Sequence, residues 1–224
     1  AAAMGNLPDA YNGLGDCYFY GKHVNQDYSQ AIMLYTQAAK MDRTITRLEL
    51  ARCYERGLGV EKSDSLAVLY YQNVAEAGNA EAMARVGEYY HKGELVRKDH
   101  ARAAHWFELA AAKGNLSSMD YLGSYYYKGI HYVKNIPLGV EWYTKAAEQG
   151  YLYSQFALGI HYYDSKDYGK ALAWFLKAAH QGHLPSMNLV GYLYREQKTE
   201  EGYRESFKWW SKAAEHGYAS AQHN

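Results

Sequence analysis

The chain has 224 residues, of which 24 are basic and 24 acidic, so its formal net charge is +0. This balance gives no general electrostatic attraction to nucleic acid or to an anionic membrane. No apolar run approaches the ~20 residues that a membrane-spanning helix needs. We therefore expect no nucleic-acid partner and no direct membrane insertion.

In chain order, the sequence divides into similar units, each predicted to be a hairpin of two helices. In the first, Asp9 is expected to cap a helix that ends near Gly21, and Asp27 to open the second helix. The units cover approximately residues 6–42, 43–78, 79–114, 115–150, 151–182 and 183–217. Residues 1–5 and 218–224 read as parts of flanking units, so 1–224 is predicted to be one repeat solenoid.

The third and fourth units carry further helix signals. Asp99 and Asn135 are expected N-caps of second helices, and Pro137 suits a first helical turn. Gly129 is expected to end a first helix in the left-handed conformation, and Gly150 to end a second helix.

The period is visible at an apolar marker position in each first helix. The markers are Leu14, Leu50, Val86, Leu122, Leu158 and Val190, which are 36 residues apart except for a last step of 32. A tyrosine follows every marker by four residues, and a glycine or alanine follows it by one. Because a glycine inside a helix costs roughly 1 kcal/mol relative to alanine, these glycines predict close approach of the second helix.

The residues of the fourth unit, YLGSYYYKG and EWYTKAAEQG, are similar to the Sel-like repeat, a branch of the tetratricopeptide superfamily. The resemblance covers essentially the whole chain and implies an all-α, right-handed superhelical solenoid of about six antiparallel helix hairpins. It implies an interaction scaffold or adaptor, as in adaptors of ER-associated degradation, activators of fungal chitin synthase and exported bacterial proteins. Some bacterial members carry paired cysteines within each repeat. This chain instead has only Cys17 and Cys53, which we expect to be buried free thiols.

The last two units depart from the pattern between their helices. The fifth loop is four residues shorter, with Ser165 in place of the usual glycine, and the sixth has Gln197 there. Tolerated loop variation is one interpretation, and a tailored contact surface is the other.

Residues with chemical potential do not form a recognisable reactive motif. The ten histidines lack an HExxH or CxxC frame, no GxSxG segment is present, and the glycines fall at repeat positions. We therefore expect no catalytic residue, no metal site and no cofactor.

The resemblance also implies which side chains face the concave side of the solenoid. In the first half these are Asp9, Asn12, Asp16, Phe19, Tyr20, Leu48, Arg52, Glu55, Arg56, Glu88, His91 and Lys92. In the second half they are Asp120, Ser124, Tyr127, Lys128, Tyr153, Phe156, Ile160, Tyr163, Tyr192 and Arg195, half of which are aromatic. The predicted binding site consists of Tyr127, Lys128, Tyr153, Phe156, Tyr163, Tyr192 and Arg195. Exposed tyrosines suit binding because they bury much area with few rotors. Packing against the next repeat is the alternative for each of them.

The predicted function is a non-catalytic scaffold that binds a peptide or protein segment. The alternatives are a hydrolase acting on peptide or cell-wall material, and a carbohydrate-binding module. End-to-end self-association is expected through Ala1 to Met4 and Tyr218 to Gln222, whose apolar faces lack a neighbour. The sequence leaves the compartment open among exported, ER-lumenal and cytoplasmic locations.

Overall fold

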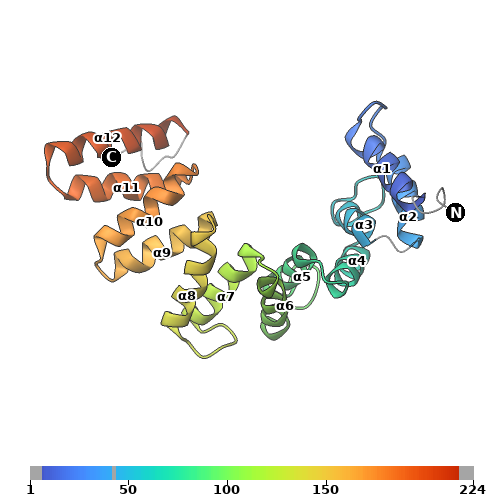
Figure 1. Cartoon of the computed structure of the whole chain (residues 1–224), viewed down its shortest axis with the longest axis horizontal. Helices are drawn as coiled ribbons and strands as arrows, with labels where there is room; N and C mark the ends of the chain where they lie inside the picture. The colour runs from blue at the N-terminus through green and yellow to red at the C-terminus, as the bar shows by residue number, and fades with distance from the viewer. Residues whose placement is uncertain (1–6, 42–43, 217–224) are drawn as a thin grey trace. The chain divides into compact units, whose positions relative to one another are not determined.

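A computed structural model describes residues 7–41 and 44–216, which form twelve α-helices and contain no strand (Figure 1). The predicted all-α class is confirmed. The hairpins are α1 (Leu7–Tyr20) with α2 (Tyr28–Lys40), α3 (Thr44–Arg56) with α4 (Asp64–Glu76), α5 (Ala80–Lys92) with α6 (His100–Ala112), α7 (Leu116–Lys128) with α8 (Ile136–Glu148), α9 (Leu152–Asp164) with α10 (Tyr168–His180), and α11 (Leu184–Glu196) with α12 (Glu200–Glu215). The terminal segments expected to self-associate lie outside the described residues.

The chain divides into two compact units, residues 1–118 and 119–224. The first unit contains α1 to α6, and the second contains most of α7 and all of α8 to α12. Each unit is described by itself below.

The helix ends follow local capping chemistry. Asp27, Asp99 and Asn135 accept hydrogen bonds from backbone N–H groups of the first turns of α2, α6 and α8, as predicted. Gly129 has a φ of +76°, in agreement with its predicted left-handed conformation. The prediction for Asp9 was wrong: α1 already begins at Leu7, so the carboxylate lies within the first turn, where it faces the positive end of the helix dipole.

In five of the six hairpins, the repeated glycine of the first helix lies beneath an aromatic ring of the second helix, whereas the second hairpin has Ala51 at this position. A Cβ added at Gly159 would lie 2.4 Å from the ring of Phe175, and one at Gly123 would lie 2.6 Å from the ring of Tyr143. The same pairing joins Gly15 to Tyr35, Gly87 to Phe107 and Gly191 to Trp210. Close approach of the second helix was therefore predicted correctly. A fully buried ring sits above the glycine in the Phe175 hairpin, so the glycine makes room for a large apolar side chain.

Hydrogen bonds also join successive first helices within each unit. Thr46 Oγ1 donates to Asn12 Oδ1 at 2.8 Å, and Ser154 Oγ donates to Asp120 Oδ1 at 2.7 Å. The two residues of each pair are 34 positions apart in the sequence. The hydroxyl residue lies four positions before its own marker, and its acceptor lies two positions before the marker of the preceding repeat. These bonds hold neighbouring hairpins in register.

Asp120 provides a test of this packing. Burial raises the pKa of its carboxyl above the usual 3.8, against the lowering effects of the Ser154 hydroxyl and Lys128. A raised folded-state pKa means that the contribution of Asp120 to stability is present below pH 3.8 and is lost as pH rises through the folded pKa.

Asp120→Asn keeps an acceptor for Ser154 without the charge. We expect it to raise the free energy of unfolding at pH 7 and to have less effect at pH 3, measured by urea denaturation at both pH values. A variant less stable than the wild type at pH 7 would contradict this.

Both cysteines are free, as predicted, but only Cys53 is buried, whereas Cys17 is half-buried. Burial raises the pKa of the Cys53 thiol to about 12, so it is an inert core side chain rather than a nucleophile.

The loops inside the hairpins fall into two classes. The first four hairpins have seven-residue loops, residues 21–27, 57–63, 93–99 and 129–135. The last two have three-residue loops, residues 165–167 and 197–199. Lys166 and Lys198 take the positive φ values in these short loops, 63° and 54°.

Candidate binding clefts

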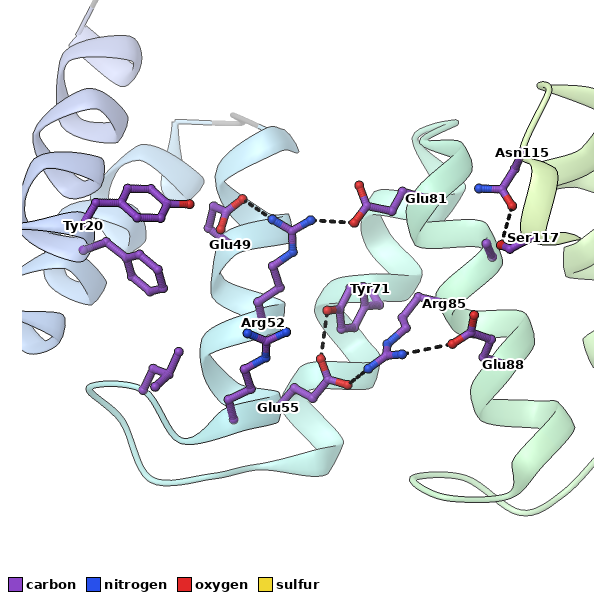
Figure 2. A pocket seen from close by; sticks show the side chains of 14 residues that line it. Tyr20, Glu49, Arg52, Glu55, Tyr71, Glu81, Arg85, Glu88, Asn115 and Ser117 are labelled. Atoms are coloured by element: carbon purple, nitrogen blue, oxygen red, sulfur yellow. Dashed lines mark hydrogen bonds and ion pairs between the residues drawn. The ribbon is translucent and has the colours of Figure 1, made fainter. Parts of the chain in front are cut away.

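The first unit contains a cleft of about 500 Å³, the charged cleft, shown in Figure 2. Its lining comes from the end of α1, from α3 and α5, and from the start of α7, with Tyr71 of α4 behind them. Its charged residues are Glu49, Arg52, Glu55, Arg56, Glu81, Arg85 and Glu88. Four carboxylates against three guanidinium groups leave the lining with a net negative charge.

Two of the arginines each bridge two carboxylates (Figure 2). Arg52 contacts Glu49 at 2.8 Å within α3 and Glu81 of α5 at 2.5 Å. Arg85 of α5 contacts Glu88 at 3.0 Å and also pairs with Glu55 of α3. These ion pairs connect successive hairpins across the floor of the charged cleft.

Glu55 is the centre of the second cluster. Its carboxylate accepts hydrogen bonds from Tyr71 Oη at 3.1 Å and from Tyr89 Oη at 2.8 Å, besides its pair with Arg85. Burial pushes the pKa of Glu55 up, but the hydrogen bonds from Tyr89 and Arg85 outweigh burial and lower the pKa below 4.5. Burial and the same carboxylate raise the pKa of Tyr89. The cluster is therefore ionised and internally satisfied at neutral pH.

Sequence reasoning identified part of the charged cleft. Among its lining residues, the predicted concave positions are Phe19, Tyr20, Arg52, Glu55, Arg56 and Glu88. It missed Glu81, Tyr71 and the charged residues immediately before two markers, Glu49 and Arg85. Opposite charges at that position in successive repeats were a readable signal for an ion-pair network.

The second unit contains a smaller cleft of about 380 Å³, the tyrosine cleft, between α9, α10 and α11. Its lining consists of Tyr163, Tyr168, Gly169, Leu172, Tyr192, Leu193, Glu196 and Gln197. The rings of Tyr163 and Tyr168 meet edge to face with centroids 5.5 Å apart. Half of the surface of Tyr168 is exposed, so an apolar and aromatic wall faces solvent.

The rim of the tyrosine cleft is charged. The Arg195 guanidinium lies 5.3 Å from the ring centroids of both Tyr192 and Trp210, which fixes one face of Tyr192. Glu196 is 3.8 Å from Arg195, and about half of its side chain is exposed. The rim thus offers a carboxylate to solvent beside the tyrosine rings.

Of the predicted site residues, the structure brings Tyr163 and Tyr192 together in the tyrosine cleft, with Arg195 beside them. Tyr168, Leu172 and Leu193 were missed by the sequence prediction. Tyr168 and Leu172 lie on the second helix α10, and Leu193 follows the marker Val190 by three residues, which is not one of the predicted concave positions.

The other predicted site residues lie elsewhere in the second unit. Tyr153 and Phe156 surround His183, with ring centroids 6.4 and 4.7 Å away, and burial lowers the pKa of that histidine. Tyr127 is hydrogen-bonded to His161 at 3.2 Å and packs against the core, and Lys128 is exposed at the end of α7.

Within the described part of the chain, no group of three histidine, cysteine or carboxylate side chains is placed to hold a metal ion. None of the described helices is long and apolar enough to cross a membrane.

The stacked hairpins and solvent-facing clefts define a helix-hairpin repeat protein. A profile of the Sel1 repeat matches residues 8–42, 47–79, 80–115, 116–151, 152–183 and 184–218. The chain belongs to the Sel1 repeat family, whose members are typically protein-interaction scaffolds and generally non-catalytic.

Solved structures are similar along nearly the whole chain. The Escherichia coli protein c5321, described as a protective antigen of uropathogenic strains displaying an SLR fold, is 30% identical with a TM-score of 0.86. The match covers 99% of this chain and 48% of c5321, so the chain spans about half the length of that protein. A Sel1 repeat protein from Oxalobacter formigenes is 26% identical with a TM-score of 0.83, over 94% of this chain and 88% of that protein. The immunity protein PA5088 from Pseudomonas aeruginosa, 18% identical with a TM-score of 0.57 over 93% of this chain and 82% of its own, shares the fold alone. No curated protein matches the sequence significantly.

Proposed function

We propose that this chain is a non-catalytic scaffold that binds a segment of a partner protein, and that the tyrosine cleft is its principal contact surface. The observation that carries the proposal is the gathering of Tyr163, Tyr168 and Tyr192 with Leu172 and Leu193 around one solvent-facing hollow. An aromatic and apolar hollow with a few polar groups at its edge is typical of binding hot spots.

The chemistry of the tyrosine cleft supports a protein segment as ligand. Tyrosine rings provide large apolar contact at low conformational cost, and their hydroxyl groups orient the ligand. The leucine side chains give a floor that water solvates poorly. Peptide side chains match this combination.

The charged cleft suits a supporting role. Its two arginine clusters are already satisfied internally, so a ligand that displaced these ion pairs would have to compensate for their loss. We propose that its net negative charge favours association with a partner that carries basic residues, because peripheral charges act mainly on association rates.

A random-peptide phage library panned against the chain tests the proposal. We expect selected peptides to bind the double variant Tyr163→Ala/Tyr192→Ala at least about tenfold more weakly than the wild type, since truncated hot-spot residues typically cost 1–2 kcal/mol or more. The control is Tyr203→Ala, which removes a tyrosine of α12 that is 53% exposed and lies outside the cleft. Binding should be measured by biolayer interferometry and helicity by circular dichroism.

Three results would contradict the proposal. One is a set of selected peptides that bind the double variant and the wild type equally. Another is a glycan array with specific, Tyr163-dependent binding and no peptide binding, which would favour a carbohydrate-binding module. The third is sustained hydrolysis abolished by one polar substitution, which would favour an enzyme.

A further inference from the structure

In the first unit, the loop of one hairpin covers the side of the preceding hairpin. The backbone of Gly59, in the loop of residues 57–63, lies so close to Tyr28 of α2 that an added Cβ would be 2.5 Å from the Tyr28 carbonyl carbon. Leu58 and Val60, on either side of this glycine, pack against the core cluster that contains Ile32. An aliphatic–glycine–aliphatic segment thus closes the surface between the first and second hairpins.

The tyrosine cleft occupies the equivalent place between the last two hairpins. Tyr168, Leu172 and Leu193 lie 140 residues after Tyr28, Ile32 and Cys53, at the same positions of the repeat. The residues that would cover them belong to the loop between α11 and α12, which is only residues 197–199.

Because the loop between α11 and α12 is short, Leu172 and Tyr168 are expected to be more exposed than their counterparts in the first unit, and they are. Ile32 is 9% exposed in the cluster against which Leu58 and Val60 pack, whereas its counterpart Leu172 is only partly buried. Tyr168 is 51% exposed, whereas Tyr28 is partly buried beside Gly59. The tyrosine cleft is therefore the space that a seven-residue loop fills in the first unit.

We propose that a loop of the partner protein fills this space in the same way, by placing an aliphatic–glycine–aliphatic segment over Tyr168 and Leu172. The inference rests on the proposed function and specifies its ligand. Glycine is required at the centre because the backbone must approach the start of α10 as Gly59 approaches Tyr28, with a φ near the +70° of Gly59. The two aliphatic side chains bury the leucine floor, and the exposed carboxylate of Glu196 favours a basic neighbour in the partner loop.

The chain itself supplies a probe, a head-to-tail cyclised peptide with the sequence of residues 56–63, RGLGVEKS. Titrated into the ¹⁵N-labelled chain, it should shift the amide resonance of Gly169, which lies in the cleft, with a dissociation constant of about 1 mM, as expected for two small anchors. The matched peptide carrying Leu58→Asp and Val60→Asp should cause no shift. Absence of a Gly169 shift with the first peptide, or equal shifts with both, would overturn the inference.

A loop graft tests the same geometry by filling the cleft from within the chain and measuring whether the cyclic peptide can still bind. Replacing residues 197–199 with the loop of residues 57–63 should fill the cleft, so the cyclic peptide should no longer shift Gly169. The control graft has the same length and carries Leu58→Ser and Val60→Ser, and it should leave peptide binding within about twofold of the wild type. Unchanged binding by the apolar graft would overturn the inference.

The phage selection separates this inference from the proposed function. Peptides that depend on Tyr163 and Tyr192 but lack an aliphatic–glycine–aliphatic segment would leave the proposed function intact and refute the loop hypothesis. Selected peptides that bind the cleft through a lysine or arginine side chain alone would also leave the proposed function intact and refute the loop hypothesis. If no selected peptide binds at the tyrosine cleft, both the proposed function and the loop hypothesis are refuted.

Discussion

Phe175→Ala is expected to lower the free energy of unfolding by roughly 3–5 kcal/mol, the usual cost of truncating a buried phenylalanine. Its ring is fully buried in the core of the second unit and covers Gly159 of the paired helix. Removing the ring leaves a cavity that helices α9 and α10 can close only by moving together. Urea denaturation followed by circular dichroism measures the effect.

A second substitution tests whether the ring and the glycine act as a pair. Gly159→Leu alone should lower the free energy of unfolding by about 1–3 kcal/mol, because its side chain would overlap the Phe175 ring. In the double variant the leucine has the space that the ring vacated, so the combined loss should be smaller than the sum by about 1–3 kcal/mol. Strict additivity would show that the glycine has another role. Gly13→Ala is the control: its added Cβ meets nothing within 4 Å, so it should stabilise the chain by up to about 1 kcal/mol.

Glu55→Ala is expected to destabilise the chain by about 3 kcal/mol, at the lower end of the range for removing one partner of a buried ion pair. The substitution leaves Arg85, Tyr71 and Tyr89 without their shared acceptor, although Arg85 is 36% exposed and water can compensate part of the loss. The matched control is Glu81→Ala. That carboxylate also pairs with an arginine across the repeats but is 63% exposed, so its loss should cost at most about 0.5–1 kcal/mol.

The effect of Glu55 should depend on pH with a defined sign. Because the folded-state pKa of Glu55 is lowered, its stabilising contribution is complete above its ordinary pKa of 4.5 and is lost as pH falls through the lowered value. The difference in unfolding free energy between wild type and Glu55→Ala should therefore be constant from pH 6 to pH 8 and shrink below pH 4.5. A difference that stays unchanged at acid pH would mean that packing, not the charge network, accounts for the destabilisation.

The local architecture of the hairpins could be predicted from the sequence. The 36-residue spacing of the markers predicts the hairpins, and caps such as Asp27, Asp99 and Asn135 predict where second helices begin. These features depend on helical periodicity and on hydrogen bonds within one turn, which are readable from neighbouring residues. The departure of the sixth loop from the pattern at Gln197 was also visible, but its shortening to residues 197–199 and the cleft beside it were not.

Tertiary packing decided how the repeated positions are used. Tyr127 and Tyr163 occupy the same position in successive repeats, yet Tyr127 is hydrogen-bonded to His161 while Tyr163 lines the tyrosine cleft. The partner of Tyr127, His161, belongs to the next hairpin and is 34 residues away in the sequence. The ring that Tyr163 meets, Tyr168, lies at the start of α10 in the same hairpin. The periodicity of one helix places a side chain on a face. What lies opposite that face depends on the neighbouring repeat and on the length of its loop.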